Sequence, residues 1–211
     1  MPQIWADQEE VIFSDGVPDD PKHIYELMMG ALAEQRRSVV EYMVDGIDVL
    51  KSGNFPKSFD KIEAKSMIHD EITLRITKES MKLIEKLDLE VDAYSRNILC
   101  TPWSEVFKRM DSLIEKIQPF ADLVDNVATF ANAYSPPWSE RLDELAKFQG
   151  ETLSLILKCF EGGDPAGLSD VMTTTLIPLV KRIKKFFHEE VIPHLESSVV
   201  ELSQSIDTSN A

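Results

Sequence analysis

The sequence predicts an α+β protein, in which a small mixed-sheet head (residues 1–77) is followed by an up-down four-helix bundle (residues 78–211). Two observations support this prediction. Within residues 1–77, apolar residues alternate with polar ones or gather in short β-branched runs, which is typical of strands. From Thr77 onward, apolar residues recur every three or four positions, which is typical of amphipathic helices, and short connections between them favour antiparallel neighbours.

The first predicted element is a β-hairpin at the start of the chain. Its strands are "IWA" (4–6) and "EVIF" (10–13), joined across "DQE". The Asp15-Gly16 pair, a frequent turn sequence, closes this hairpin.

A single helix is predicted next. Asp20 suits the N-cap, and Pro21 suits the first helical position, where its missing N–H costs no hydrogen bond. The residues on its apolar face are Ile24, Leu27, Met28 and Ala31.

The valine-rich stretch "SVVEYMVDGIDVL" (38–50) predicts two extended segments joined at an Asp45-Gly46 turn. A period of two places alternate side chains of the first segment on opposite faces. The residues expected in the core of the head are Val40, Tyr42 and Val44. The residues expected to point outward are Val39 and Met43. Apolar side chains on an otherwise exposed face indicate that something covers it, either the helical part of the same chain or a partner protein.

The stretch "HDEITLRIT" (69–77) is predicted to be the last strand of the head. Ile72, Leu74 and Ile76 alternate with polar residues, and on a helix these three would fall on different faces. The order of elements in the head is therefore strand, strand, helix, strand, short strand, loop and strand.

This order resembles the ubiquitin-like β-grasp fold, and the segment "VDGIDVLKSGNFPKSFDKIEAKSMIHDEITLRIT" looks like the second half of such a domain. The resemblance implies binding of partner proteins through the sheet. In modifiers and sulfur carriers of that family a free di-glycine tail follows the last strand, whereas here "KESMKLIEKL" follows, so conjugation and sulfur carriage are disfavoured. The whole chain also looks like bacterial proteins of unknown function that join a small α+β head to a helical tail.

Local signals predict where the helices of the bundle begin and end. Thr77 is expected to cap the first, Thr101 with Pro102 the second, and "SPPWSE" (135–140) opens the third. In "GGDP" (162–165) the glycines suit a helix end, Asp164 a cap and Pro165 a first turn. The last helical region extends to about Ser205. Kinks or interruptions are expected at Pro119, Pro178 and Pro193.

Composition excludes several classes of function. The net charge of −15 is spread over both parts of the chain, so neither offers the positive field that nucleic acids require. The two cysteines, Cys100 and Cys159, are too few for a disulfide framework and are expected as small buried side chains. The start of the chain lacks a secretory pattern, and no apolar run reaches the length of a membrane span. We therefore expect a cytoplasmic protein that acts on neither membranes nor nucleic acids.

No motif predicts a catalytic, metal or cofactor site. The nearest pattern is "HEEVIPH" (188–194), whose histidines are six residues apart and so lie on different faces of a helix. There is no nucleophile elbow, no P-loop lysine and no set of cysteines for a cluster. We expect no cofactor.

The basic cluster "KRIKKFFH" (181–188) contrasts with the acidic chain. The residues that share one helix face there are Lys181, Lys184, Lys185 and His188, called the basic stripe below. The stripe is either a solvated face paired with acidic neighbours or a docking surface for an acidic partner or for another copy of this protein.

The predicted function is therefore a non-enzymatic interaction or assembly module. It would act on an unknown protein partner, or by self-association, through the basic stripe or the sheet face of Val39 and Met43. The alternative is a small-molecule-binding or enzymatic bundle with a pocket near Pro119 and Pro178, since bundle cores can house such sites.

Overall fold

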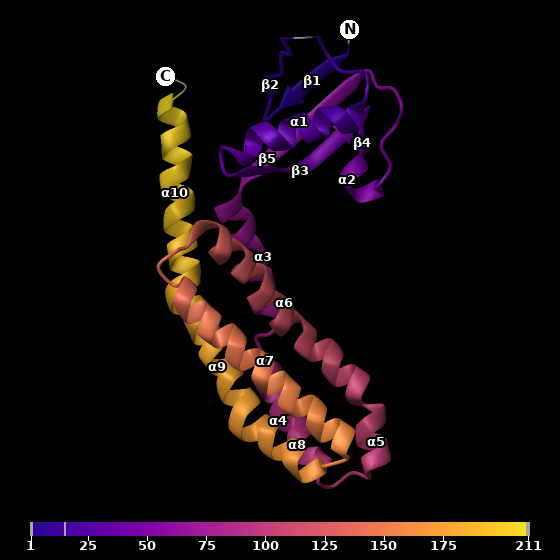
Figure 1. The fold of residues 1–211 in the computed structure, drawn as a ribbon, viewed down its shortest axis with the longest axis vertical. Helices are drawn as coiled ribbons and strands as arrows, with labels where there is room; N and C mark the ends of the chain where they lie inside the picture. Colours follow the sequence, from indigo (N-terminus) through magenta and orange to yellow (C-terminus); the bar gives the residue numbers. More distant parts are fainter. Residues whose placement is uncertain (1, 15, 210–211) are drawn as a thin grey trace. The chain divides into compact units, whose positions relative to one another are not determined.

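The computed structural model describes residues 2–14 and 16–209. The chain forms two compact units, Met1–Ile72 and Thr73–Ala211, so that the division lies a few residues before the predicted boundary at Thr77. The first unit contains a mixed five-stranded sheet, and the second contains packed helices, which confirms the α+β class (Figure 1). Asp15 of the predicted Asp15-Gly16 turn lies outside the described residues.

The sheet has the order β2-β1-β5-β3-β4. Its strands are β1 (Gln3–Ala6), β2 (Glu9–Glu10), β3 (Arg37–Val44), β4 (Ile47–Asp48) and β5 (Lys61–Ile68). The β1 and β5 strands pair in parallel, and the other pairs are antiparallel. The sheet therefore joins the first and last strands of the unit at its centre.

Helix α1 (Pro21–Ala33) begins where the sequence predicts. The Asp20 side chain caps it by accepting a hydrogen bond from the Lys22 backbone N–H, and Pro21 is its first residue. Ile24 and Met28 are buried against one face of the sheet, where the Tyr42 hydroxyl donates to the Pro21 carbonyl oxygen at 2.8 Å. The core of this unit thus lies between α1 and a single face of the sheet (Figure 1).

Residues with positive φ form the turns of both hairpins. Asp45 and Gly46 both have positive φ and join β3 to β4, which confirms the predicted turn; α2 (Val49–Ser52) follows directly. The first hairpin turns at Asp7-Gln8, and its second strand, β2, covers only Glu9–Glu10. The predicted strand over residues 10–13 is therefore wrong beyond Glu10.

A β-bulge in β3 overturns the predicted facing of Val39. Val39 pairs with Ser66 and Glu41 with Lys65, so that Val40 is one residue more than β5 can match. The extra residue reverses the alternation, and as a result Val39 joins Tyr42 in the core, with 7% of its surface exposed, whereas Val40 is 41% exposed. Val39 is thus a core residue and not a surface residue.

The prediction of a strand over "HDEITLRIT" is also wrong, because His69–Leu83 form helix α3. The last strand is β5, which ends at Ile68. The buried positions of α3 are partly polar: Asp70, Thr73 and Thr77 lie inside, while Ile76 is exposed. The helical period is therefore hidden when only apolar residues are counted.

Only some of the predicted helix starts in the second unit are correct. Thr77 lies inside α3 and caps nothing, and the residue before α5 (Trp103–Lys108) is Pro102 rather than Thr101. By contrast, Asp164 caps α8 (Pro165–Val171) by accepting from the Gly167 backbone N–H, as predicted, and Gly163 ends the preceding helix with positive φ.

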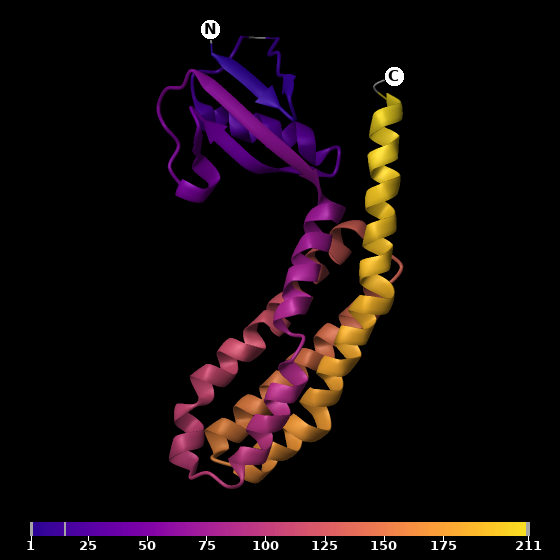
Figure 2. The ribbon, with the colours of Figure 1, turned by 180° about the vertical axis from the view of Figure 1, so that it is seen from behind.

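The remaining helices pack around one apolar core. They are α4 (Leu87–Ile98), α6 (Met110–Tyr134), α7 (Ser139–Gly162), α9 (Ile177–Phe186) and α10 (Ile192–Ser209). Helix α6 packs along α7, α7 along α8, and α4 along α8 and α9 (Figures 1 and 2). Pro119 lies within α6, which continues through it as one helix.

The predicted interruptions at Pro178 and Pro193 are two π-helical turns, η1 (Met172–Leu176) and η2 (Phe187–Val191). In each turn the isoleucine before the proline donates its N–H five residues back: Ile177 to the Met172 oxygen and Ile192 to the Phe187 oxygen. Both prolines therefore follow a widened turn, and helical structure continues from Pro165 to Ser209.

Candidate functional sites

The sheet of the first unit has a second face, opposite α1 (Figure 2). Met43 lies on this open face, as predicted, and is partly buried. The register places Trp5 and Met43 on either side of Glu63, in one row across β1, β5 and β3. Met67, paired with Ser38, lies on the same face. Sequence reasoning missed Trp5 and Met67 because their neighbours come from distant strands.

Two ion pairs lie on the open face. The Lys65 ammonium lies 2.6 Å from Glu41, and Lys61 lies 2.9 Å from Glu63. The indole N–H of Trp5 is buried without a hydrogen-bond acceptor among the described residues. The face thus combines an aromatic ring and two thioethers with two local ion pairs, a composition that favours protein contacts over a charged ligand.

Polar contacts tie the start of β3 to its neighbours. Asp7 accepts from the Ser66 backbone N–H at 2.8 Å and from the Arg37 guanidinium at 3.0 Å. The Ser38 hydroxyl lies 2.7 Å from His69 Nε2, the spacing of a nucleophile–base pair. The His69 backbone N–H also donates to the Arg36 carbonyl oxygen. Since these contacts join the turn of the first hairpin, the start of β3 and the end of β5 to one another, we assign them to the fold.

The residues of the basic stripe have two kinds of environment: one is paired inside the unit and the others are exposed to solvent. Lys184 donates to the Glu85 carbonyl oxygen and lies 2.9 Å from Asp88, with 21% of its side chain exposed. Burial raises the pKa of Asp88, but the Lys184 ammonium outweighs this and holds it below the usual range. Lys181, Lys185 and His188 are exposed, and Lys185 lies 3.9 Å from Glu189. Lys184 therefore holds α9 against α4, and only the other three residues face solvent.

An apolar groove lies between α6 and α7 and has a volume of about 200 Å³. Its lining residues are Met110, Leu113, Ile114, Ile117, Gln118, Ala121, Leu153, Ile156, Leu157 and Phe160. Ile114 and Leu157 remain 50% and 54% exposed. Gln118 is the single polar residue of this lining. Gln118, the residue before Pro119, thus lines the groove. The groove therefore lies near one of the two prolines where the sequence predicts a pocket, although the sequence did not identify its lining.

The histidines and cysteines form no metal site in the described part of the chain. The His194 ring packs edge-on against Trp138 at a centroid distance of 6.2 Å. Cys100 is exposed, which contradicts the predicted burial, and Cys159 is half-buried; both are free thiols. Burial raises the pKa of the Cys159 thiol, so it is less reactive than an ordinary cysteine.

Across the described residues, none of the helices combines the length and apolar character that a membrane span requires. Comparison of the chain with protein-family models, with curated proteins and with solved structures found no match. Inferences about function therefore rest on the residues of this chain alone.

Proposed function

We propose that this protein is a non-enzymatic interaction or assembly module that binds a partner protein through the open face of its sheet. The observation that supports the proposal is the row formed by Trp5, Glu63 and Met43, with Met67 nearby on the same face. Tryptophan and methionine are enriched at protein interfaces, and the local pairing of the charges around them reduces the cost of covering the face.

We infer that the first unit is a ubiquitin-like β-grasp domain. The support is its element order together with the strand order β2-β1-β5-β3-β4, the parallel central pair β1 and β5, and one helix across a single face. Strand β5 runs directly from Ile68 into α3 at His69, which argues against a free carrier tail. The inference therefore favours recognition of a partner over conjugation.

We also infer an up-down four-helix arrangement for the second unit. Its support is the short connection over residues 135–138 between α6 and α7, and the packing of α4, α6, α7 and the helical run from Pro165 around one core. Such a bundle would act as a rigid support for surfaces on its helices.

The test of the open face is Met43→Glu in the full chain. Partners are captured from lysate of the native host and identified by mass spectrometry. We expect the variant to lose a partner that the wild type retains, because a buried unpaired carboxylate at an interface is costly. The matched control is Ile47→Glu in the same hairpin, since Ile47 is 63% exposed and pairs with Val44, which belongs to the face that α1 covers. Equal capture by all three proteins would contradict the role of this face.

The basic stripe is a second candidate surface for the same function. Reversal of Lys181 and Lys185 to glutamate tests it without removing the Lys184–Asp88 pair. Loss of the partner in this variant, with Met43→Glu unaffected, would transfer the proposal from the sheet to the stripe.

The alternative function, small-molecule binding in a pocket near Pro119 and Pro178, has its support in the groove beside Pro119. The single polar side chain of its lining gives little means to orient a metabolite, since specific ligand sites combine apolar walls with several polar groups. The groove therefore favours an apolar occupant, and a thermal-shift screen with metabolites is expected to leave the melting temperature unchanged.

A further inference from the structure

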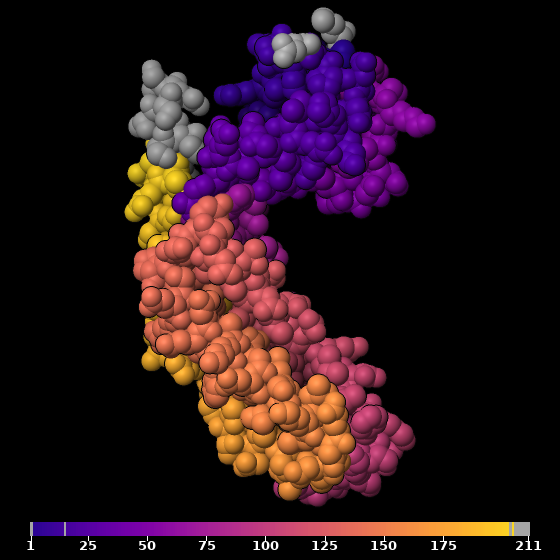
Figure 3. Space-filling model, in the orientation of Figure 1, coloured from indigo at the N-terminus to yellow at the C-terminus, as the bar shows by residue number. Residues whose placement is uncertain are grey.

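The groove between α6 and α7 has an apolar floor that is open to solvent. Ile114 and Leu157 face each other's helices with about half of their surfaces exposed, and Met110 and Leu153 are partly buried beside them. Both helices lie side by side in Figures 1 and 2, and Figure 3 shows the surface over them. An exposed apolar surface rimmed by polar residues is typical of a binding site.

The rim of this groove on the α6 side is acidic. With about 100° per residue, the exposed side chains next to the lining positions of α6 are Asp111, Glu115, Asp122 and Asp125. Within the described residues none of these four carboxylates lies in an ion pair, although Asp122 accepts a hydrogen bond from Gln118. Lys116 lies on another side of α6, where it pairs with Glu90.

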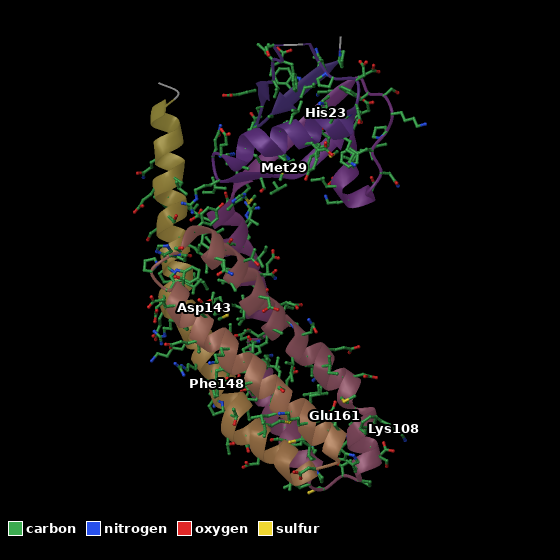
Figure 4. The ribbon with its side chains drawn as sticks, in the orientation of Figure 1. His23, Met29, Lys108, Asp143, Phe148 and Glu161 are labelled. Atoms are coloured by element: carbon green, nitrogen blue, oxygen red, sulfur yellow. The ribbon has the colours of Figure 1, made fainter. Side chains whose placement is uncertain are left out.

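The α7 rim carries both signs of charge. Asp143 and Glu161, labelled in Figure 4, lie on this flank, and so do Lys147 and Lys158; all four are exposed. Gly150 also lies on the flank, and nothing lies within 4 Å of the position of a Cβ there. A glycine in an exposed helix interior costs about 1 kcal/mol of helix stability and permits close approach of another chain.

We propose that the α6–α7 groove binds an amphipathic helix whose polar side is basic, contributed by a partner protein. The apolar floor fits the apolar face of such a helix, and the unpaired carboxylates of α6 fit lysine or arginine along one of its edges. The lining from Met110 to Ala121 extends about 17 Å along α6, which matches roughly three turns of the occupant. A second copy of this protein is a poorer fit, because its net charge is −15.

This proposal shares with the proposed function only the premise that the protein binds other proteins. It concerns another unit and another surface, so each can fail alone. Loss of a captured partner in Met43→Glu, combined with no peptide binding at the groove, would overturn the groove proposal and leave the sheet proposal standing.

The probe is a fluorescein-labelled peptide of leucine and lysine, about 18 residues long, with leucines at helical spacing. It is titrated into the full chain, and binding is measured by fluorescence anisotropy. A peptide with glutamate in place of lysine, and one with the same residues in strand-like alternation, are the matched probes. We expect only the first peptide to bind, and equal binding of all three would overturn the proposal.

Substitutions on α7 test the apolar floor. Leu157→Ser is expected to weaken binding about tenfold, since a leucine side chain contributes that much when it is buried. The control is Leu155→Ser, because Leu155 is 44% exposed but lies roughly 200° around the helix from Leu157, on the side of Phe148 (Figure 4). Ile114→Ser repeats the test on α6. Equal effects of Leu157→Ser and Leu155→Ser would contradict binding in the groove.

Charge reversals distinguish binding to the acidic rim of α6 from attraction to the overall negative charge of the chain. Asp111→Lys with Glu115→Lys is expected to weaken binding of the Leu/Lys peptide at least about tenfold. Glu9→Lys with Glu10→Lys makes the same change in net charge on β2 and is expected to change affinity less than about twofold. If both pairs weaken binding equally, the peptide follows net charge alone and the proposal is wrong.

Two other occupants are distinguished by the same proteins. If dodecanoate binds the wild type but not Leu157→Ser, and the peptide does not compete with it, the occupant of the groove is an acyl chain and not a helix. A dimer detected by light scattering that dissociates in Leu157→Ser would replace it with a second copy. Either result would overturn the proposal, whereas a monomer that binds the peptide and ignores dodecanoate supports it.

Discussion

Strand β3 and the helical run from Pro165 to Ser209 both depart from a regular repeat, and they accommodate the departure differently. In β3 the extra residue, Val40, forms a bulge between Val39 and Glu41. In the helical run, two π-turns widen the helix immediately before Ile177-Pro178 and Ile192-Pro193. The bulge lies in a strand that pairs residue by residue with β5, whereas both π-turns lie within one continuous helical segment.

The difference follows from the two periods. One additional residue reverses every later side chain of a strand, but it rotates a helix by only about 100°. The bulge therefore decides which face Val39 occupies. The π-turns instead correct a gradual drift, and they keep an apolar stripe inside. The stripe consists of Met172, Leu176, Leu179, Val180, Ile183, Phe186, Phe187, Val191 and Leu195, each almost fully buried.

The strongest test of this comparison is deletion of Met43. Without it, Tyr42 would move to the open face and Glu41 to the core, since the alternation before Val44 would be reversed. Burial of a carboxylate and exposure of a core tyrosine are expected to destabilise the first unit by more than about 4 kcal/mol. Amide hydrogen exchange of β3 and β5 measures the effect. Retained protection of both strands would show that the sheet can re-register.

The helical counterpart is deletion of Thr174 from η1. This removes the extra residue of the π-turn and forces Pro178 into a regular α-helix, which costs about 3 kcal/mol. Urea unfolding followed by circular dichroism measures the loss. Adding Pro178→Ala to the deletion is expected to restore most of the stability; failure to do so would mean that the π-turn has a role other than accommodating proline.

Ion pairs in the two units offer a third comparison. Lys184→Met removes the contact with Asp88 and the bond to the Glu85 carbonyl oxygen, and is expected to cost about 2 kcal/mol at pH 7. Because Lys184 lowers the pKa of Asp88 in the folded protein, the pair stabilises above the unfolded pKa of about 4 and loses this effect as the pH falls through the folded value. Urea unfolding at several pH values measures it.

The control for this pair is Lys65→Met on the open sheet face. Lys65 has 70% of its side chain exposed, so solvent screens its contact with Glu41, and the substitution is expected to leave the urea midpoint nearly unchanged. A deficit of Lys184→Met that stays constant down to pH 2 would contradict the assignment to Asp88.

The smallest expected effect is that of deleting Val40. This removes the bulge but leaves Val39, Tyr42 and Val44 on the same face, since Val40 has no partner on β5 in the register. The stability is expected to change by less than about 1 kcal/mol. If the Val40 deletion destabilised the protein as much as the Met43 deletion, the bulge would have a role beyond setting which side chains face the core.

Several features of the fold could be predicted because their causes are local. The change from a two-residue to a helical period separates sheet from helices and predicts the α+β class. Asp20-Pro21 and Asp164-Pro165 predict helix starts, because a cap and a proline act within a few residues. The prolines at 178 and 193 similarly predict where the last helical region departs from regularity.

Other features were decided only by tertiary structure. The sequence around His69 alternates like a strand, yet it forms α3, and Asp70, Thr73 and Thr77 lie on the buried side of this helix, which no count of apolar residues detects. The facing of Val39 depends on its pairing with Ser66, and the row of Trp5 and Met43 depends on β5 lying between their strands. The groove likewise requires α6 and α7 to lie side by side. Burial and cross-strand neighbours are set by segments distant in sequence, so local propensity cannot specify them.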